Sequence, residues 1–158
     1  MVTFVTGKIN SGKTTKLFEL YQKTGQGDGY IAIKQMQGTK VVEYTAKRLS
    51  SDDSFPYVVR DEFDPGTKKI ACSIGPYRFY QDAVDEIVSE IRRMIEYSIE
   101  PIYLDEIGQL ELRGECFAKV FQKMVDCGLD IVVSVKKELL EDVIRTFAIH
   151  DHKIVRTD

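Results

Sequence analysis

The chain has 158 residues, of which 43% are hydrophobic and 30% are charged, a balance typical of one globular domain. It contains no run of about 18 apolar residues, which excludes an ordinary membrane-spanning helix. The formal net charge of −3 gives no general attraction to polyanions, so nucleic acid is not indicated as a partner. No protein partner is indicated either.

The N-terminal residues include no basic segment, long apolar stretch or small-residue cleavage site, so we expect no secretory signal and a cytoplasmic location. The 3 cysteines are widely spaced, which fits neither a disulfide framework nor a zinc motif. We therefore expect free thiols.

The first half of the chain predicts a strand, a glycine loop, a helix and then several short strands. Val2–Val5 is apolar and ends near a glycine, and Lys13–Lys23 carries apolar residues at helical spacing. Beyond it, β-branched and aromatic residues are broken by glycine and proline, with turn residues at Gln37–Thr39 and Asp64–Gly66. We expect a β-hairpin insertion over about residues 30–73.

The second half alternates helices and strands. Pro76 is expected in the first turn of an amphipathic helix that ends near Tyr97. The remaining predicted elements are a strand at Ile102–Asp105, a helix at Glu115–Cys127, a strand at Ile131–Val135, a helix at Leu139–Phe147 and a strand at Lys153–Val155. This alternation predicts an α/β protein of three layers, with a mainly parallel sheet and right-handed crossovers.

A glycine-rich loop follows the first predicted strand. The pattern Gly-x-x-x-x-Gly-Lys-[Ser/Thr] of a phosphate-binding loop, or Walker A motif, is met by Gly7, Gly12, Lys13 and Thr14. Its position directly between a strand and a helix is the context that such a loop requires. The sequence therefore predicts a P-loop protein that binds a nucleoside triphosphate.

Each fixed residue of the loop has a mechanical reason. Glycines let backbone N–H groups face phosphate oxygens, and the following helix adds the positive end of its dipole. We expect Lys13 to neutralise the β- and γ-phosphates during catalysis, and Thr14 to supply a hydroxyl ligand for magnesium. The predicted nucleotide-binding residues are Gly7, Lys8, Ile9, Asn10, Ser11, Gly12, Lys13, Thr14 and Thr15.

Two adjacent carboxylates, Asp105 and Glu106, follow the apolar run Ile102–Leu104. Because the chain turns at the end of a strand, the two acids are expected to point in different directions. Asp105 is predicted to hold magnesium together with Thr14, and Glu106 to polarise the attacking water as the catalytic base. Glu111 either braces the loop after Asp105 or faces water.

The two motifs together resemble those of the cancer-related nucleoside-triphosphatase family. The loop Gly7–Thr15 and the segment Asp105–Leu112 are similar to the family's phosphate loop and its second motif, Asp-Glu-Ile-Gly-x-Met-Glu-Leu. Looser similarity covers almost the whole chain, including Gly29–Tyr30 and Ile74–Tyr77. The resemblance implies a P-loop fold and slow hydrolysis of ATP, GTP and other triphosphates, with a glutamate beside the magnesium aspartate as base.

Some positions depart from the family's pattern. Leu110 replaces the usual methionine, a volume-conserving change. Pro76 replaces a lysine, and the family's hairpin arginine has no clear counterpart here, with Lys34 as the one candidate. The source of transition-state charge is therefore left open. Arg78 and Arg113 are candidates for that role, although a surface pair with a nearby glutamate is the simpler interpretation of either.

The sequence thus predicts a magnesium-dependent nucleoside-triphosphatase with ATP or GTP as substrate. Two alternatives stay open. A kinase would use the same loop to pass the γ-phosphoryl group to a nucleotide or another small acceptor. A nucleotide-dependent binding switch would use slow turnover only to time its contact with a partner. No arginine-rich lid segment follows Glu111, which weighs against the kinase.

Overall fold

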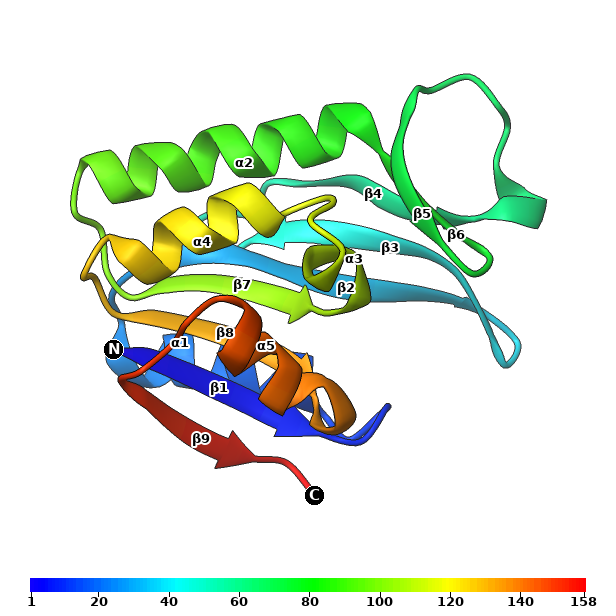
Figure 1. Ribbon diagram of the computed structural model, residues 1–158. Helices are drawn as coiled ribbons and strands as arrows, with labels where there is room; N and C mark the ends of the chain where they lie inside the picture. The colour runs from blue at the N-terminus through cyan, green and yellow to red at the C-terminus, as the bar shows by residue number, and fades with distance from the viewer.

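The computed structural model describes residues 1–158 and contains one nine-stranded sheet with helices on both faces (Figure 1). The strand order is β5-β6-β4-β3-β2-β7-β8-β1-β9. The strands are β1 (Val2–Gly7), β2 (Asp28–Gln37), β3 (Lys40–Arg48), β4 (Ser54–Arg60), β5 (Ile70–Ile74), β6 (Tyr77–Tyr80), β7 (Ile102–Ile107), β8 (Ile131–Lys136) and β9 (His152–Arg156). The helices are α1 (Lys13–Thr24), α2 (Gln81–Glu96), α3 (Gln109–Leu112), α4 (Ala118–Asp126) and α5 (Leu140–Thr146), with short 3-10 turns at Asp61–Phe63 and Lys137–Leu139.

The sheet has a parallel half and an antiparallel half. Strands β2, β7, β8, β1 and β9 pair in parallel, as the alternation of strands and helices predicts. The antiparallel half consists of β3, β4, β6 and β5, which all come from the segment between α1 and α2. The predicted three-layer α/β fold with an antiparallel insertion is confirmed, and the inserted strands continue as far as Tyr80.

Two details of the insertion differ from the sequence-based expectation. Pro76 does not open a helix, because Gly75 and Pro76 form the turn between β5 and β6, and α2 begins at Gln81. Strand β4 contains Pro56, although proline has no N–H group to donate and is rare in the interior strands of a sheet. The proline is tolerated because β6 pairs only with Val58–Arg60, so no neighbouring strand needs a hydrogen bond from Pro56 on that side.

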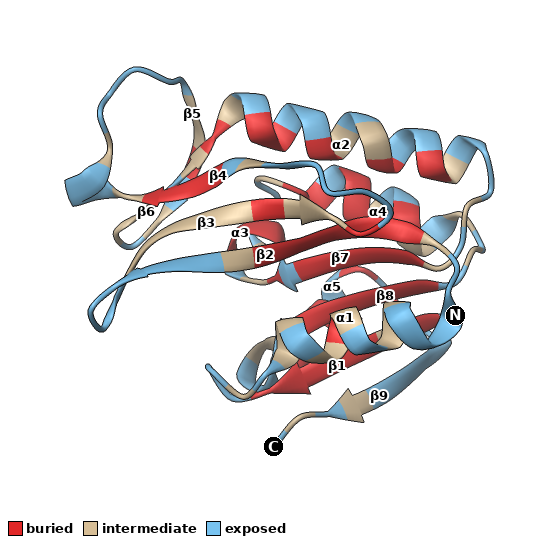
Figure 2. Ribbon diagram, turned by 180° about the vertical axis from the view of Figure 1, so that it is seen from behind, coloured by how far each residue is buried: buried red, intermediate tan, exposed pale blue.

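The core lies on both faces of the sheet, because neighbouring residues of a strand point to opposite sides. Phe4 and Leu104 face the larger core beneath α2, α4 and α5, whereas Val5 and Tyr103 face α1 and its buried Leu17. Figure 2 shows α1 alone on its face of the sheet. Burying a large aliphatic side chain contributes ~1.5–3 kcal/mol, so both helical layers are held to the sheet by apolar burial.

The parallel strands also position the site. The carboxyl ends of β1, β7 and β8 meet at one edge of the sheet, where open α/β folds bind ligands. The loop before α1 begins at this edge, and the antiparallel strands extend beyond it on one side (Figure 1). None of the helices is both long and apolar enough to cross a bilayer.

Candidate active site

The phosphate loop connects β1 to α1, as the motif predicts. Gly12, the residue before α1, has φ 90°, a left-handed conformation that strains any residue with a Cβ atom. No side chain caps this end of the helix. The first N–H groups of α1 are therefore available to an anion, with the positive end of the helix dipole behind them.

Lys13 lies over the loop. Its Nζ atom donates to the backbone carbonyl of Lys8 at 2.7 Å and contacts that of Gly7 at 3.4 Å. Burial lowers the pKa of Lys13, whereas the nearby Glu106 carboxylate raises it. The ammonium group is thus held where a bound phosphate chain would meet it.

Asp105 forms the hydrogen-bonded centre of the site. It is 4% exposed, and its Oδ2 atom accepts hydrogen bonds from the Thr14 hydroxyl at 2.7 Å and from the Ala32 backbone N–H at 3.0 Å. Its Oδ1 atom accepts a hydrogen bond from Ser134. Burial raises the pKa of Asp105, while these hydrogen bonds and the charge of Lys13 lower it. The structure therefore brings the predicted metal ligands Thr14 and Asp105 into direct contact.

Ser134 is a site residue that the motifs do not identify. It is completely buried in β8, where its hydroxyl donates to Asp105 and accepts from the Glu106 N–H at 2.7 Å. The signal that could have revealed it is a lone hydroxyl within the apolar run Ile131–Val135. A buried hydroxyl needs hydrogen-bond partners, and these two acids supply them.

Glu106 and Asp105 point in different directions, as expected, but the cause is a bulge within β7 and not the end of the strand. Strand β7 continues to Ile107, but its register with β8 shifts between Leu104 and Ile107, and Glu106 has φ 62°. Such a bulge re-aims a side chain, and here it turns Glu106 into the cavity. Desolvation within the cavity, and then the Asp105 carboxylate, raise the pKa of Glu106 to about 7.

Glu111 braces the segment that follows Glu106. Its buried carboxylate accepts hydrogen bonds from the backbone N–H of Gly108 at 2.8 Å and of Phe117 at 3.3 Å. Burial raises the pKa of Glu111 to about 7, although both hydrogen bonds lower it. The bracing role considered from the sequence is therefore the one that the structure has.

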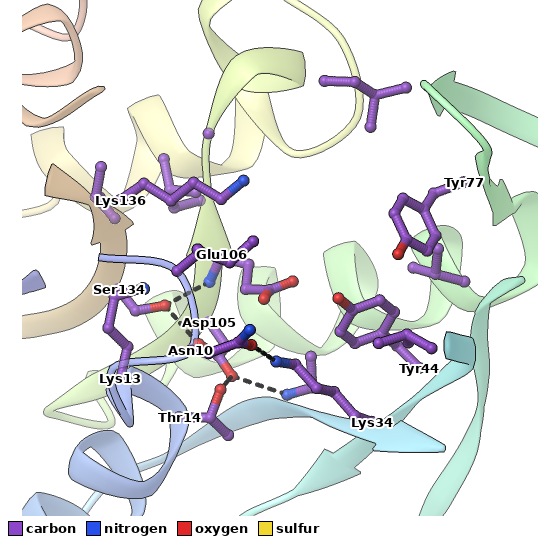
Figure 3. Close-up of a pocket in the computed structure, with 18 of the residues that line it drawn as sticks. Asn10, Lys13, Thr14, Lys34, Tyr44, Tyr77, Asp105, Glu106, Ser134 and Lys136 are labelled. Atoms are coloured by element: carbon purple, nitrogen blue, oxygen red, sulfur yellow. Dashed lines mark hydrogen bonds between the residues drawn. The ribbon is translucent and has the colours of Figure 1, made fainter. Parts of the chain in front are cut away.

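A cavity of about 740 Å³ joins these groups (Figure 3). Besides the phosphate loop and the two acids, its walls carry Lys34 and Lys136, which lie on different sides of Glu106. Lys34 also hydrogen-bonds Asn10 of the loop. The arginines proposed from the sequence do not line the cavity. Arg113 pairs with Glu115 at 3.9 Å, as the surface-pair interpretation expects, whereas Arg78 pairs with an aspartate, Asp64, at 3.5 Å.

The donor set suits a magnesium ion that is shared with phosphate. The Thr14 hydroxyl and the Asp105 carboxylate are hard oxygen ligands, and magnesium in phosphate sites usually binds one or two carboxylates plus phosphate oxygens and water. No group of three or more His, Cys, Asp or Glu side chains could hold a metal ion. The remaining ligands would therefore have to come from the nucleotide and from water.

Comparison with known proteins points in the same direction. A family model described as NTPase matches residues 2–157. The nucleoside-triphosphatases THEP1 of Thermotoga maritima and of Thermotoga sp. strain RQ2 are each 24% identical over 138 residues, which cover 87% of this chain and 75% of the relative.

Two solved structures share the fold. The crystal structure of THEP1 from the hyperthermophile Aquifex aeolicus matches with a TM-score of 0.71 at 18% identity, over 99% of this chain and 90% of that chain. The solution structure of a human cancer-related nucleoside triphosphatase matches with a TM-score of 0.64 at 21% identity, over 98% and 87% of the two chains. At identities this low, the two solved structures establish only a common fold. The family resemblance inferred from the motifs is confirmed by the family model, which matches residues 2–157.

Proposed function

This chain belongs to the NTPase family, whose model matches nearly its whole length, and we propose on that premise that it binds and slowly hydrolyses nucleoside triphosphates with magnesium. The observation that carries the proposal is the contact between Thr14 and Asp105 at 2.7 Å, at the start of α1, where no side chain caps the helix. This arrangement joins an anion site to a pair of hard oxygen ligands, which is what a magnesium–triphosphate complex requires.

In this proposal the phosphate loop binds and orients the triphosphate. The residues from Gly7 to Thr15 hold its oxygens, and Lys13 leaves the carbonyl of Lys8 to meet the β- and γ-phosphates. Thr14 and Asp105 would hold magnesium, which, when bound, neutralises charge that develops on the phosphate oxygens. Ser134 and the Ala32 N–H keep the Asp105 carboxylate in place.

Glu106 is the proposed base. The bulge in β7 directs its carboxylate into the cavity, where a water molecule can lie between it and the γ-phosphoryl group. The water oxygen attacks phosphorus, its proton passes to Glu106, and the bond between phosphorus and the β,γ-bridging oxygen breaks, which leaves a diphosphate and inorganic phosphate.

Lys34 and Lys136 are the proposed sources of positive charge for the transition state. Both line the cavity beside Glu106, and neither Arg78 nor Arg113 reaches it. Charge spreads over the equatorial oxygens of the transferred group, so cations on two sides of it stabilise the transition state more than the ground state.

Phosphate release from ATP, GTP, CTP and UTP, with and without magnesium, tests the proposal. We expect magnesium-dependent release that Lys13→Ala abolishes, because the substitution removes charge that neutralises the phosphates in the ground and transition states. Lys123→Ala, on the exposed side of α4, serves as the matched control. Release at the parental rate by Lys13→Ala, or in excess chelator, would refute the assignment.

A further inference from the structure

The cavity continues past Glu106 into a part that the hydrolysis of a triphosphate does not use. We name this part the hairpin compartment, because antiparallel strands of the insertion and their turns form its wall. Its residues are Val41, Tyr44, Val58, Arg60, Ile74, Tyr77 and Phe79. Strand β3 is two strand positions from β7 and four from β1, which corresponds to about 10 Å and about 19 Å at the usual strand spacing.

The reaction geometry places the substrate's nucleoside on the other side. Attacking and leaving oxygens lie roughly in line across the transferred phosphorus. Because Glu106 marks the side of the attacking water, the β-phosphate and the nucleoside must extend away from it, toward the phosphate loop on β1. This step rests on the proposed function. The hairpin compartment therefore lies on the nucleophile's side and is left free by the triphosphate.

The compartment's walls are suited to a flat ring. The rings of Tyr44 and Tyr77 lie 5.8 Å apart at 73°, and both hydroxyl groups point into the space in front of Glu106 (Figure 3). Phe79 and the aliphatic side chains of Val41, Val58 and Ile74 complete an apolar lining. An aromatic pair of this kind offers faces and edges against which a further ring can stack.

Two cations beside the tyrosine rings, Arg60 and Lys40, would favour binding of an anionic group in the compartment. The Arg60 guanidinium lies 5.9 Å from the centre of the Tyr77 ring, and Lys40 also lines the cavity. The two cations share a single carboxylate, that of Glu62, at 2.5 Å from Arg60 and 3.2 Å from Lys40. Arg60, Lys40 and Glu62 together carry one net positive charge, and the planar guanidinium group of an arginine matches the geometry of a phosphate.

We propose that the hairpin compartment binds a second small molecule, a planar ring joined to a phosphate, such as a nucleoside monophosphate, while the phosphate loop holds its own nucleotide. The ring lies against Tyr44 and Tyr77, and the phosphate lies against Arg60 and Lys40. A molecule in this position borders the water side of Glu106, so the cavity holds two ligands on opposite sides of the reacting phosphorus.

Tyrosine-ring NMR spectra of the whole chain test this proposal without any turnover. The protein is saturated with ADP and magnesium, and AMP, GMP, CMP and UMP are then titrated separately. We expect at least one monophosphate to shift the Tyr44 and Tyr77 ring signals saturably, with the signal of Tyr97, which is 68% exposed at the end of α2, unchanged. ADP alone should leave the Tyr44 and Tyr77 signals nearly unshifted.

Substitutions test the ring contact and the phosphate contact separately. Tyr77→Leu and Arg60→Gln should each raise the monophosphate Kd at least about tenfold, which corresponds to ~1.4 kcal/mol. Tyr77→Phe keeps the ring and should restore the affinity, while Tyr97→Leu and Arg92→Gln on α2 serve as controls. Equal weakening by Tyr77→Phe would contradict stacking as the source of affinity.

Three results would overturn the proposal. The first is that none of the four monophosphates shifts the Tyr44 and Tyr77 ring signals saturably. ADP alone could shift both rings to the same extent, which would assign the compartment to the base of the first nucleotide. A monophosphate could also act only by displacing ADP. Since no outcome depends on phosphate release, a failure here is distinguishable from a failure of the hydrolase assignment.

Discussion

The Thr14 hydroxyl donates a 2.7 Å hydrogen bond to the Asp105 carboxylate, although 91 residues separate the two in sequence. The contact exists because β1 and β7 are parallel strands that both pair with β8, so the loop after β1 and the carboxyl end of β7 lie at one edge of the sheet. Thr14 and Asp105 would together hold a magnesium ion here, and the ion would supply positive charge beside the phosphate oxygens.

Asp105→Asn should therefore weaken magnesium-dependent binding. The substitution keeps the shape of the side chain but removes its charge, so the magnesium concentration for half-maximal triphosphate binding should rise at least about tenfold. Titration of magnesium with a non-hydrolysable triphosphate measures this change, and Asp52→Asn on the exposed β3–β4 connection is the control. An unchanged magnesium requirement would exclude Asp105 as a ligand.

Glu106→Gln should affect chemistry and leave binding intact. Glutamine keeps the size and a hydrogen-bonding oxygen but loses the basicity, and general-base catalysis contributes ~10²–10⁴-fold to a rate. We expect kcat to fall by that factor at nearly constant nucleotide affinity, as measured by single-turnover hydrolysis beside a binding titration. Glu96→Gln at the exposed end of α2 is the control. A parental rate in the Gln variant would make Glu106 a structural residue only.

Ser134→Ala should lower both stability and activity. The change leaves the Asp105 Oδ1 atom and the Glu106 N–H without the partner that now serves both. A buried group left without its hydrogen bond costs about 1–3 kcal/mol, which urea unfolding would detect. Because the same hydroxyl positions both acids, kcat should also fall. Ser89→Ala, exposed on α2, should change neither quantity.

Lys34→Met and Lys136→Met test the source of transition-state charge. Each keeps most of the side-chain length and removes a cation beside Glu106, so each should lower kcat by about 10²-fold, the effect of losing one electrostatic contact. Lys34→Met also breaks the contact with Asn10, which should loosen the phosphate loop and raise KM. Lys123→Met, measured in the same way, is the control. If Lys34→Met and Lys136→Met both keep the parental kcat, neither lysine supplies the transition-state charge.

Glu111→Gln should reduce the pH dependence of stability. The pKa of Glu111 is raised from 4.5 to about 7 in the folded protein, so the folded state binds more protons than the unfolded state between these values. Stability is consequently lost as pH rises through about 7, by up to about 3 kcal/mol for this group. Urea unfolding at pH 5 and pH 8 should show a smaller difference in Glu111→Gln than in the parent. If the stability difference between pH 5 and pH 8 is the same in Glu111→Gln and in the parent, Glu111 does not cause the pH dependence.

Much of this protein follows from local sequence. The glycine pattern around Lys13 predicts the phosphate loop, because the conformations and free N–H groups that it needs depend on a few neighbouring residues. The parallel strands are likewise predicted by apolar runs that alternate with amphipathic helices, such as Ile131–Val135 before α5. Asp105 and Glu106 are predicted as site residues because they directly follow such a run, Ile102–Leu104.

The tertiary structure alone decided the features that depend on pairing between distant segments. The left-handed turn of Glu106 comes from a register shift against β8, and the role of Ser134 comes from its place opposite that shift. Arg60, and not Arg78, lines the cavity, because neighbouring strands of the insertion set which side chains face inward. The sequence of one strand determines only that its side chains alternate between two faces. Pairing with the neighbouring strand determines which of these faces is turned to the cavity.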